Sequence, residues 1–428
     1  MSFNPLVHQL HDEAEILDLL RQINVEQRGL PILAVKAIFQ GVKLHGVRSP
    51  AANIMKQEML SLGGDVAVAD GVVNCSVERS DVLVMGTTRQ LHALVGRLRK
   101  NTAFELSKLA AQMGEALEAY AWEPAEIRCG RHILSLASHT HIMGVINVTT
   151  DSFYQGNCYL DPGAAVEAGL RMEDEGADII DVGGESTRPG ADPVGTEEEL
   201  SRVLPVVERL VKEASVPISV DTYKAEVAKQ VLDAGVDLIN DISGLSFDSH
   251  LAADVARYDV GVIISHIRGV PTTMQENPCY EDLLGEVMAE LRGRCEDAAE
   301  RGIPPSQMIV DPGIGFGKTT DHNLQLIKHL HILKVLRKPI LIGVSRKAFL
   351  GQLLGVPAEE RLIGTLAAVA MSIQQGARIV RVHDVREVKQ AARVVDAIRR
   401  GSAEGPGDAG LSPAPAKPRE ERGGKTLR

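Results

Sequence analysis

Short apolar runs recur along the second part of the chain, and each ends in a cluster of polar residues. Most of these runs are β-branched and apolar for four to six residues, which is typical of strands buried on both faces. Helical stretches separate most of them, and Gly176, Gly235 and Gly376 stand shortly before a run, where a helix C-cap belongs. The eight runs lie within residues 141–149, 177–187, 216–224, 236–244, 260–269, 308–318, 339–347 and 377–385.

Eight β/α units within residues 129–400 predict an α/β fold, the (β/α)8 or TIM barrel. A doubly wound open sheet is the alternative, but it rarely has eight repeats of such even length. The carboxyl ends of barrel strands converge on one mouth, so we expect the polar residues that end the runs to be neighbours in space. These residues are Asn147, Glu185, Thr187, Arg188, Asp221, Asn240, His266, Arg268, Asp311, Ser345, Lys347, Arg381 and His383.

The first 128 residues follow a different pattern and predict a small α+β domain. Ser49 and Thr87 are candidate helix N-caps, each followed by a helical stretch. We find no catalytic motif in this part, so a structural or assembly module is expected. Three short apolar segments indicate strands, at residues 65–70, 71–78 and 81–87.

The last segment, residues 401–428, is rich in glycine, proline and charge and predicts a disordered tail. The 428-residue chain carries a formal net charge of −11, and this acidic balance argues against nucleic-acid binding, which needs concentrated Lys and Arg. No apolar run reaches about 18 residues, so no membrane span is expected. The five cysteines are scattered without paired spacing, which predicts free thiols in a reducing cytoplasm rather than a zinc site or disulfides.

Three of the strand-end residues, Asp221, Asn240 and Asp311, can pair with the edge of a flat nitrogen heterocycle. A buried site for such a ring needs a partner for every polar edge, so residues of this kind occur in sets. Alternatively, Asp221 and Asp311 only cap the next helix or make a turn. The occurrence of all three at strand ends favours the heterocycle interpretation.

Cationic residues gather at the ends of the last two runs. Lys347, Arg381 and His383 lie there, and Arg188 follows the second run. In many barrels the loops after strands seven and eight hold a phosphate, and forked Arg donors suit a pyrophosphate. A structural Arg–Asp pair, for instance Arg381 with Asp384, is the alternative.

Three further segments bear on a ligand. Asn147 offers a neutral oxygen that would suit Mg²⁺ carrying a diphosphate. The polar loops at residues 149–157 and 183–191 are too long for simple turns and could close over a substrate. VDPGIGFGK, at 310–318, lacks the spacing of a phosphate-binding P-loop. Its glycines are expected to let the backbone approach a flat ligand, with Phe316 beside it.

Eight motifs together resemble those of the dihydropteroate synthase family, in its order and spacing, over about residues 140–390. They are INVTTDSF, DVGGESTRPGA, ISVDT, INDISG, HIRGVPTTMQ, DPGIGFGK, GVSRK and RVHDV. The resemblance implies that 6-hydroxymethyl-7,8-dihydropterin diphosphate and 4-aminobenzoate are condensed to 7,8-dihydropteroate and pyrophosphate in folate biosynthesis. It also implies Mg²⁺ as cofactor and a homodimer formed through barrel helices.

The same resemblance implies roles for individual residues. Asn147 would be the protein ligand of Mg²⁺. The residues expected to take part in catalysis are Asp221, Lys347, Arg381 and His383. The residues expected to bind substrate are Thr187, Arg188, Asp221, Asn240, Asp311, Phe316, Ser345, Lys347, Arg381, Val382 and His383.

The chain departs from the family pattern at a few positions. Thr150 and Gln155 stand where the family usually has proline and aspartate, so no contact to metal or substrate is expected from Gln155. Ile267 replaces a methionine, which is a tolerable apolar exchange. Ala348 follows Lys347 where a polar residue is common.

Two other functions are alternatives. A pterin-binding methyltransferase barrel shares the Asp and Asn residues that bind the edge of the pterin ring, but it needs no diphosphate site. A barrel that binds pterin without catalysis needs no cation set either. The strings STRP, SRK and RVHD therefore favour the synthase.

Overall fold

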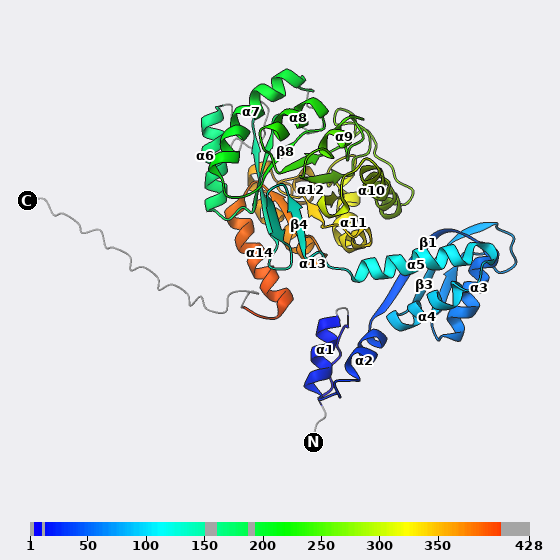
Figure 1. The fold of residues 1–428 in the computed structure, drawn as a ribbon. Helices are drawn as coiled ribbons and strands as arrows, with labels where there is room; N and C mark the ends of the chain where they lie inside the picture. The colour runs from blue at the N-terminus through cyan, green and yellow to red at the C-terminus, as the bar shows by residue number, and fades with distance from the viewer. Residues whose placement is uncertain (1–3, 11–12, 150–160, 187–192, 404–428) are drawn as a thin grey trace, which may run out of the picture. The chain divides into compact units, whose positions relative to one another are not determined.

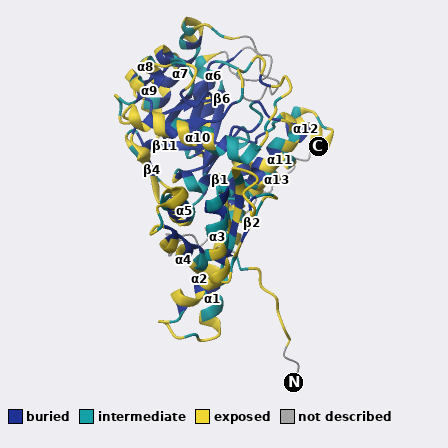
Figure 2. Ribbon diagram, turned by 90° about the vertical axis from the view of Figure 1, so that its right-hand side faces the viewer, coloured by how far each residue is buried: buried dark blue, intermediate teal, exposed yellow. Residues whose placement is uncertain are grey.

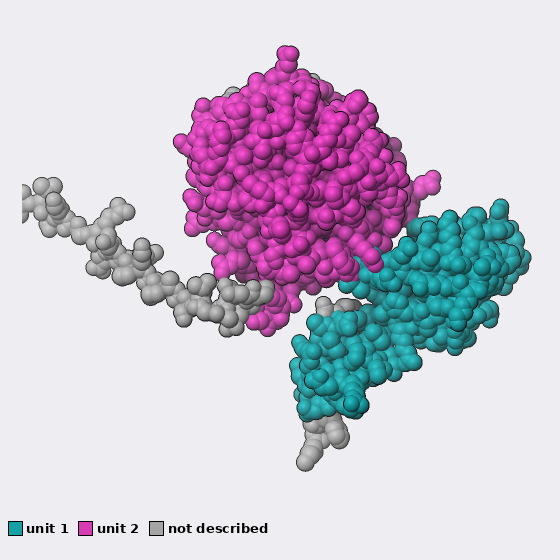
Figure 3. Space-filling view, viewed as in Figure 1, with its two compact units in different colours: residues 1–121 teal, residues 122–428 magenta. Residues whose placement is uncertain are grey.

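The computed structural model describes residues 4–10, 13–149, 161–186 and 193–403 (Figure 1). The chain divides into two compact units, residues 1–121 and residues 122–428 (Figure 3). Nearly all of the predicted tail at 401–428 lies outside the described residues. Among the described residues, no helix is both long enough and apolar enough to cross a membrane.

A three-stranded antiparallel sheet and its helices form the first unit, as the α+β prediction requires. Strand β3 (Arg79–Thr87) lies between β1 (Phe39–Arg48) and β2 (Asp65–Val68). The predicted strand at 71–78 is wrong, because Gly71 and Cys75 have φ angles of +83° and +56° and the segment turns. The helices are α1 (Glu13–Gln22), α2 (Leu30–Ala37), α3 (Ser49–Ser61), α4 (Thr88–Leu98) and α5 (Leu106–Ala121).

Eight parallel strands form the core of the second unit, one within each predicted run. They are β6 (His141–Asn147), β7 (Ile179–Gly183), β8 (Ile218–Asp221), β9 (Leu238–Asp241), β10 (Gly261–Ser265), β11 (Met308–Asp311), β12 (Leu341–Ile342) and β13 (Ile379–Val382). Strands β6 to β11 are neighbours in chain order, and β13 pairs with both β6 and β12. A parallel bridge between Val310 and Ile340 joins β11 to the segment that leads into β12, so the sheet closes on itself. This closure confirms the TIM barrel over the open doubly wound sheet.

Helices surround the barrel, and the strands between them are buried (Figures 1 and 2). The outward-facing side chains of the strands, such as Ile180, Val220 and Val382, share a buried cluster with helix residues such as Val207 of α7. The helices are α6 (Pro162–Asp174), α7 (Thr196–Glu213), α8 (Ala225–Asp233), α9 (Leu251–Val255), α10 (Leu283–Glu300), α11 (Thr320–Lys328), α12 (Ala348–Leu354), α13 (Leu362–Gln374) and α14 (Val385–Arg400). Short 3-10 helices lie at Ala103–Glu105, Pro305–Gln307, Leu330–Leu336 and Ala358–Glu360.

A hairpin that precedes the first barrel strand belongs to the second unit. Strand β4 (Glu126–Cys129) pairs antiparallel with β5 (His132–Ser135). Ile127 and Leu136 pack in one buried cluster with Met143 and other residues at the amino ends of the barrel strands. The boundary between the units therefore falls after Ala121, a few residues before the position expected from the sequence.

Candidate active site

Every second residue of the barrel strands points into the barrel, and the character of these residues changes along the strands. Near the amino ends they are apolar and form one cluster with the hairpin: Met143, Ile179, Leu238, Ile263, Ile309, Leu341 and Ile379. Two and four residues further along, the period of a strand places polar side chains on the same inner face. They are Asn147, Asp181, Asn240, Ser265, Asp311, Ser345, Arg381 and His383.

Strand register explains why distant segments meet. Asn147 of β6 is opposite Gly183 of β7, which is opposite Asp221 of β8, which is opposite Asn240 of β9. Direct partners in a sheet project to the same face. These four positions thus form one row across the barrel interior, as the prediction of converging strand ends requires.

A cavity of about 950 Å³ opens at the carboxyl ends of the strands. Seven predicted site residues line it: Asn147, Asp221, Phe316, Ser345, Lys347, Arg381 and His383. Asn240 and Asp311 are buried, with 5% and 7% exposure, and are not among its lining residues. Val382 lies apart from the cavity in the core between strands and helices. Thr187, Arg188, Thr150 and Gln155 are outside the described residues.

A buried ion-pair network at the cavity base centres on Arg381. Its Nε donates to Asp181 Oδ2 at 2.7 Å, and its Nη2 donates to Asp221 Oδ2 at 2.7 Å. Asn240 Nδ2 also donates to Asp181 Oδ2, at 3.2 Å. Arg381 thus forms the structural Arg–Asp pairs of the alternative interpretation, but with Asp181 and Asp221. Asp384, the partner named as an example, instead receives two hydrogen bonds of 2.8 Å from Arg346.

Asp181 is a member of the site that the sequence prediction missed. It is fully buried and holds the guanidinium of Arg381 in place. The prediction considered only the residues that end each strand, whereas Asp181 lies in the middle of β7. The signal was present in the alternation, because Asp181 stands two residues before Gly183, which belongs to the inner row.

Burial changes the acidity of the cavity-base carboxyls. It raises the pKa of Asp221 to about 7, although the Arg381 guanidinium opposes this rise and the Asp181 carboxylate adds to it. Burial also raises the pKa of Asp311, against a backbone hydrogen bond from Gly313 and the positive charge of Lys347. The site therefore holds Asp221 poised between its two protonation states near neutral pH.

The cations at the cavity rim are held by neighbouring side chains. Ser345 Oγ lies 2.9 Å from His383 Nδ1 and also accepts a hydrogen bond from the His383 backbone N–H at 3.2 Å. Lys347 Nζ lies 3.9 Å from the centre of the Phe316 ring, a cation–π contact. These contacts orient a lysine and a histidine toward one side of the cavity.

Two glycines of the loop after β11, Gly313 and Gly317, have a role other than the expected one. A Cβ on Gly313 would lie 1.8 Å from His266 O, and one on Gly317 would lie 2.3 Å from Arg268 O. Both glycines also have positive φ angles. They let this loop approach the backbone of the neighbouring loop after β10, whereas Gly315 and Phe316 line the cavity.

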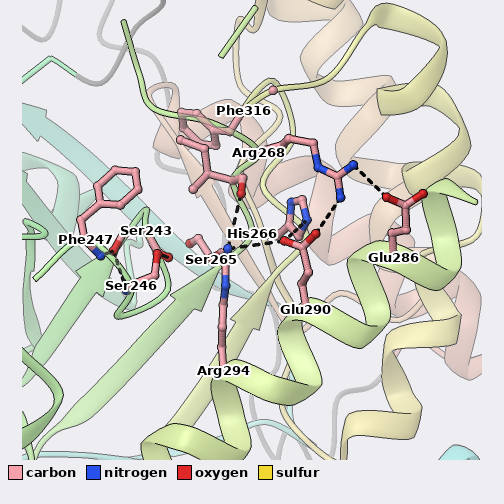
Figure 4. Close-up of polar contacts among 12 residues, drawn as sticks. Ser243, Ser246, Phe247, Ser265, His266, Arg268, Glu286, Glu290, Arg294 and Phe316 are labelled. Carbon is pink, nitrogen blue, oxygen red and sulfur yellow. Dashed lines mark hydrogen bonds and ion pairs between the residues drawn. The ribbon is translucent and has the colours of Figure 1, made fainter. Parts of the chain in front are cut away.

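A second buried network supports this loop (Figure 4). Lys318 Nζ bonds His266 Nδ1 at 2.8 Å, and Glu290 lies between His266 and Arg268, with an oxygen 2.7 Å from Arg268 Nη2. Burial lowers the pKa of Lys318 to about 7 and that of His266 to about 4. The prediction missed Lys318, since no spacing rule indicates that its side chain folds back onto His266.

Within the described part of the chain, the donor set at Asn147 suits a hydrated magnesium ion rather than a cage of protein ligands. Asn147 supplies one neutral oxygen to the cavity, and Mg²⁺ characteristically takes one or two protein ligands together with waters and phosphate oxygens. Among the described residues, the one converging group of His, Cys, Asp or Glu is His139, His141 and Asp178, at the opposite end of β6.

Comparisons with known proteins agree with this arrangement. The family described as pterin binding enzyme matches residues 143–383. The dihydropteroate synthase of Escherichia coli (strain K12) is 47% identical over 263 residues, which cover 61% of this chain and 92% of that protein. The dihydropteroate synthase of Bacillus subtilis is 45% identical over 265 residues, covering 62% of this chain and 90% of that protein.

Solved structures give the same result. The crystal structure of Yersinia pestis dihydropteroate synthase with a sulfonamide drug has a TM-score of 0.62 at 41% identity and covers 64% of this chain and 99% of its own. Dihydropteroate synthase from Xanthomonas albilineans in complex with 7,8-dihydropteroate has a TM-score of 0.57 at 39% identity, with the same two coverages.

One relative extends beyond the barrel. A Halobacterium salinarum protein described as a probable bifunctional folylpolyglutamate synthase/dihydropteroate synthase is 37% identical over 393 residues. The match covers 90% of this chain and 46% of that protein. Residues 122–428 alone are too few for this coverage, so the similarity continues into the first unit.

Proposed function

The chain belongs to the dihydropteroate synthases, a family of pterin-binding transferases, and on this premise we propose where and how its barrel carries out their reaction. The reaction joins 6-hydroxymethyl-7,8-dihydropterin diphosphate to 4-aminobenzoate and releases pyrophosphate, in folate biosynthesis. One observation carries the proposal: a single cavity has carboxylates at its base and cations at its rim. This polarity matches a substrate that is a hydrogen-bonding ring at one end and a polyanion at the other.

The pterin ring binds at the base of the cavity. Asp221, Asn240 and Asp311 supply carboxylate and amide groups for the edge of the ring, and Lys347 approaches from the rim. Arg381 fixes the Asp221 carboxylate by its 2.7 Å hydrogen bond. A preorganised set of this kind costs little rearrangement on binding.

The diphosphate binds at the rim formed by the ends of β12 and β13. His383 and Lys347 bring donors to this side, and Arg381 adds positive charge from the cavity base, where it is bound to Asp181 and Asp221. Thr187 and Arg188 are expected to contribute from the loop after β7. Ser345, which contacts the His383 ring, fixes the direction in which that ring faces. The aminobenzoate is expected beside Phe316 and Ser345, which line the same cavity.

Catalysis follows from stabilising the leaving group. The bond from the pterin methylene carbon to the diphosphate oxygen breaks with its electron pair on oxygen, and the donors of Lys347, Arg381 and His383 stabilise that charge. The ring nitrogens spread the positive charge left on the methylene, and the Asp221 carboxylate stabilises it. The amine lone pair then forms the new C–N bond, and the amine proton is released to solvent.

Magnesium is the proposed cofactor, and Asn147 is its proposed protein ligand. When bound, the ion supplies positive charge that neutralises the diphosphate. Asn147 is placed for this role by the inner row of the barrel, beside Gly183 and one strand away from Asp221. A Cβ on Gly183 would lie 3.9 Å from Asn147 Oδ1, so the glycine adds no side chain beside this oxygen.

The proposal includes a cytoplasmic homodimer. Helices α13 and α14 expose Ile363, Met371, Val394 and Ile398 by 79%, 52%, 60% and 71%, an apolar surface suited to a second copy. Sedimentation of the full chain tests this.

The cysteines Cys75, Cys129, Cys279 and Cys295 are free thiols, which supports a reducing compartment. The first unit is proposed to be a structural or assembly module.

One assay tests the proposed function. Purified protein with Mg²⁺, pterin diphosphate and 4-aminobenzoate is expected to form dihydropteroate and pyrophosphate in equal amounts. Pterin binding without product would instead favour a non-catalytic barrel, and methyl transfer from a folate would favour the methyltransferase barrel. A cation intermediate trapped with pyrophosphate would support cleavage before attack, whereas an absolute need for the amine before any pyrophosphate forms would contradict it.

A further inference from the structure

A cluster of two histidines and one aspartate lies at the amino end of the barrel, away from the catalytic cavity. His139 precedes β6, His141 is its first residue, and Asp178 directly precedes β7. One ligand atom from each residue lies within 4.8 Å of the others. Asn147, the proposed magnesium ligand, ends the same strand six residues later, about 20 Å away at the rise of a β-strand.

Hydrogen bonds fix which ring nitrogens carry protons. The hydroxyl of Ser138 donates its single proton to the Ser135 carbonyl at 2.7 Å, so the His139 Nδ1 that lies 2.9 Å from it must donate to it. His141 Nε2 lies 3.1 Å from the same carbonyl and must donate as well. In the neutral rings, His139 Nε2 and His141 Nδ1 therefore carry lone pairs.

Both lone pairs face the same carboxylate oxygen. His139 Nε2 lies 2.9 Å from Asp178 Oδ1, and His141 Nδ1 lies 3.6 Å from it. His141 is only 3% exposed, and among the described residues its Nδ1 has no hydrogen-bond partner. Three acceptor atoms thus converge, and a cation between them would satisfy all three.

The carboxylate is held in a metal-binding orientation by its second oxygen. Asp178 Oδ2 accepts hydrogen bonds of 2.8 Å from Lys389 Nζ of α14 and from the backbone N–H of Ile142. Outer contacts of this kind, including a carbonyl that accepts the second ring N–H, are the usual support of metal-ligating residues.

We propose that His139, His141 and Asp178 form a structural binding site for a divalent transition-metal ion of the zinc type. Two imidazoles and a carboxylate are the ligands that zinc prefers, whereas Mg²⁺ prefers oxygen alone. Ligands at zinc-bond length on a tetrahedral ion stand about 3.4 Å apart. The two distances from the histidines to Asp178 Oδ1, 2.9 and 3.6 Å, lie on either side of that value, and the two histidine nitrogens lie within 4.8 Å of each other. The His139 side chain is 38% exposed, which gives the ion a path from solvent.

The competing occupant is a proton. A protonated His139 ring would donate from Nε2 to Asp178 without any metal, and it would leave His141 Nδ1 unsatisfied. The two occupants differ in that only the metal engages both histidines. A metal would also join the β5–β6 connection, β6 and the start of β7, and so stabilise the end of the barrel opposite the catalytic cavity.

The experiment measures metal binding by the full chain. Protein stripped with a chelator is titrated with Zn²⁺, and with Co²⁺ as a visible probe. We expect one ion per chain, a ligand-field spectrum of low-coordinate cobalt, and a rise in Tm on the order of 5 °C with Zn²⁺ in large excess over Kd. His139→Gln, at a half-exposed position, should fold and bind Zn²⁺ about 100-fold more weakly or worse.

Two control variants make the result specific. His329→Gln alters the other His-x-His pair, at 329 and 331, which does not converge with a carboxylate, and it should bind like the wild type. Asn147→Ala should retain the zinc stoichiometry, which separates this site from the proposed catalytic magnesium. Equal Zn²⁺ affinity in wild type and His139→Gln, or equal losses in His139→Gln and His329→Gln, would overturn the proposal and leave the proton as the occupant.

Discussion

The two ends of the barrel are built from the same eight strands but have opposite character. At the amino ends, the inner side chains are isoleucines, leucines and a methionine sealed by the β4–β5 hairpin. At the carboxyl ends, the same inner face holds Asp181, Asp221, Arg381 and His383. The alternation of a strand creates both sets of positions, and the residues that fill them decide whether an end supplies stability or chemistry.

The carboxyl end, which is the proposed catalytic end, has an energetic cost that the apolar end must offset. Burial raises the pKa of Asp221 and of Asp311, so the fold disfavours their charged forms. The inner residues of the apolar end carry no such conflict, since each transfers hydrocarbon out of water. We therefore expect substitutions at one end to change stability and substitutions at the other to change turnover.

The largest effect is expected from Ile309→Ala at the apolar end. Ile309 is fully buried in the cluster beneath the cavity. Its truncation should lower the free energy of unfolding by about 2–5 kcal/mol while kcat of the folded enzyme stays near the wild-type value. Denaturant unfolding and steady-state assays on the same preparation measure both, and Ile309→Val should cost only about 0.5–1.5 kcal/mol. A large fall in kcat with normal stability would break the division between the ends.

The reciprocal test is Lys347→Ala at the catalytic end. Removal of one charge-stabilising donor should lower kcat by about 100-fold or more, with the free energy of unfolding changed by less than about 0.5 kcal/mol. His383→Ala should behave alike. Lys328→Ala, on the exposed surface of α11, is the matched control and should match the wild type in both measurements. Unaltered turnover in both cavity variants would refute the assignment of the site.

The ionisation of Asp221 is expected to affect activity and stability in opposite directions. With its pKa raised to about 7, loss of the ionised form should lower kcat/KM by about tenfold per pH unit below that value. The sign for stability is opposite. The folded state binds the Asp221 proton more tightly than the unfolded chain does. The contribution of this proton to the free energy of unfolding is therefore greatest below the ordinary pKa of 3.8 and is lost as pH rises through 7. In Asp221→Asn, the pH dependences of kcat/KM and of the free energy of unfolding should both flatten. An unchanged pH profile of kcat/KM would mean that another group causes the fall at low pH.

The sequence could predict the features that follow from regular strands, but not those that depend on how loops pack. The eight strands were predictable because each run is a continuous apolar segment, and their polar ends were found to meet, since parallel register carries Asn147 to Asp221. Asp181 was missed because the prediction considered strand ends and ignored the inner alternation. Lys318 was beyond reach, since its contact with His266 depends on how two loops pack. Gly313 and Gly317 of that loop face protein backbone for the same reason.

Val382→Ala is expected to have the smallest effect on activity. It tests whether strand alternation or the family motif decides where this side chain points. The family resemblance places Val382 among substrate-binding residues, between Arg381 and His383, whose side chains line the cavity. The Val382 side chain points the other way, into the core shared with the helices. Its truncation should lower the free energy of unfolding by about 2 kcal/mol through lost burial and leave KM for both substrates unchanged. A KM for pterin diphosphate raised by about threefold or more, at normal stability, would instead place this side chain in contact with substrate and show that the strand departs from strict alternation at its catalytic end.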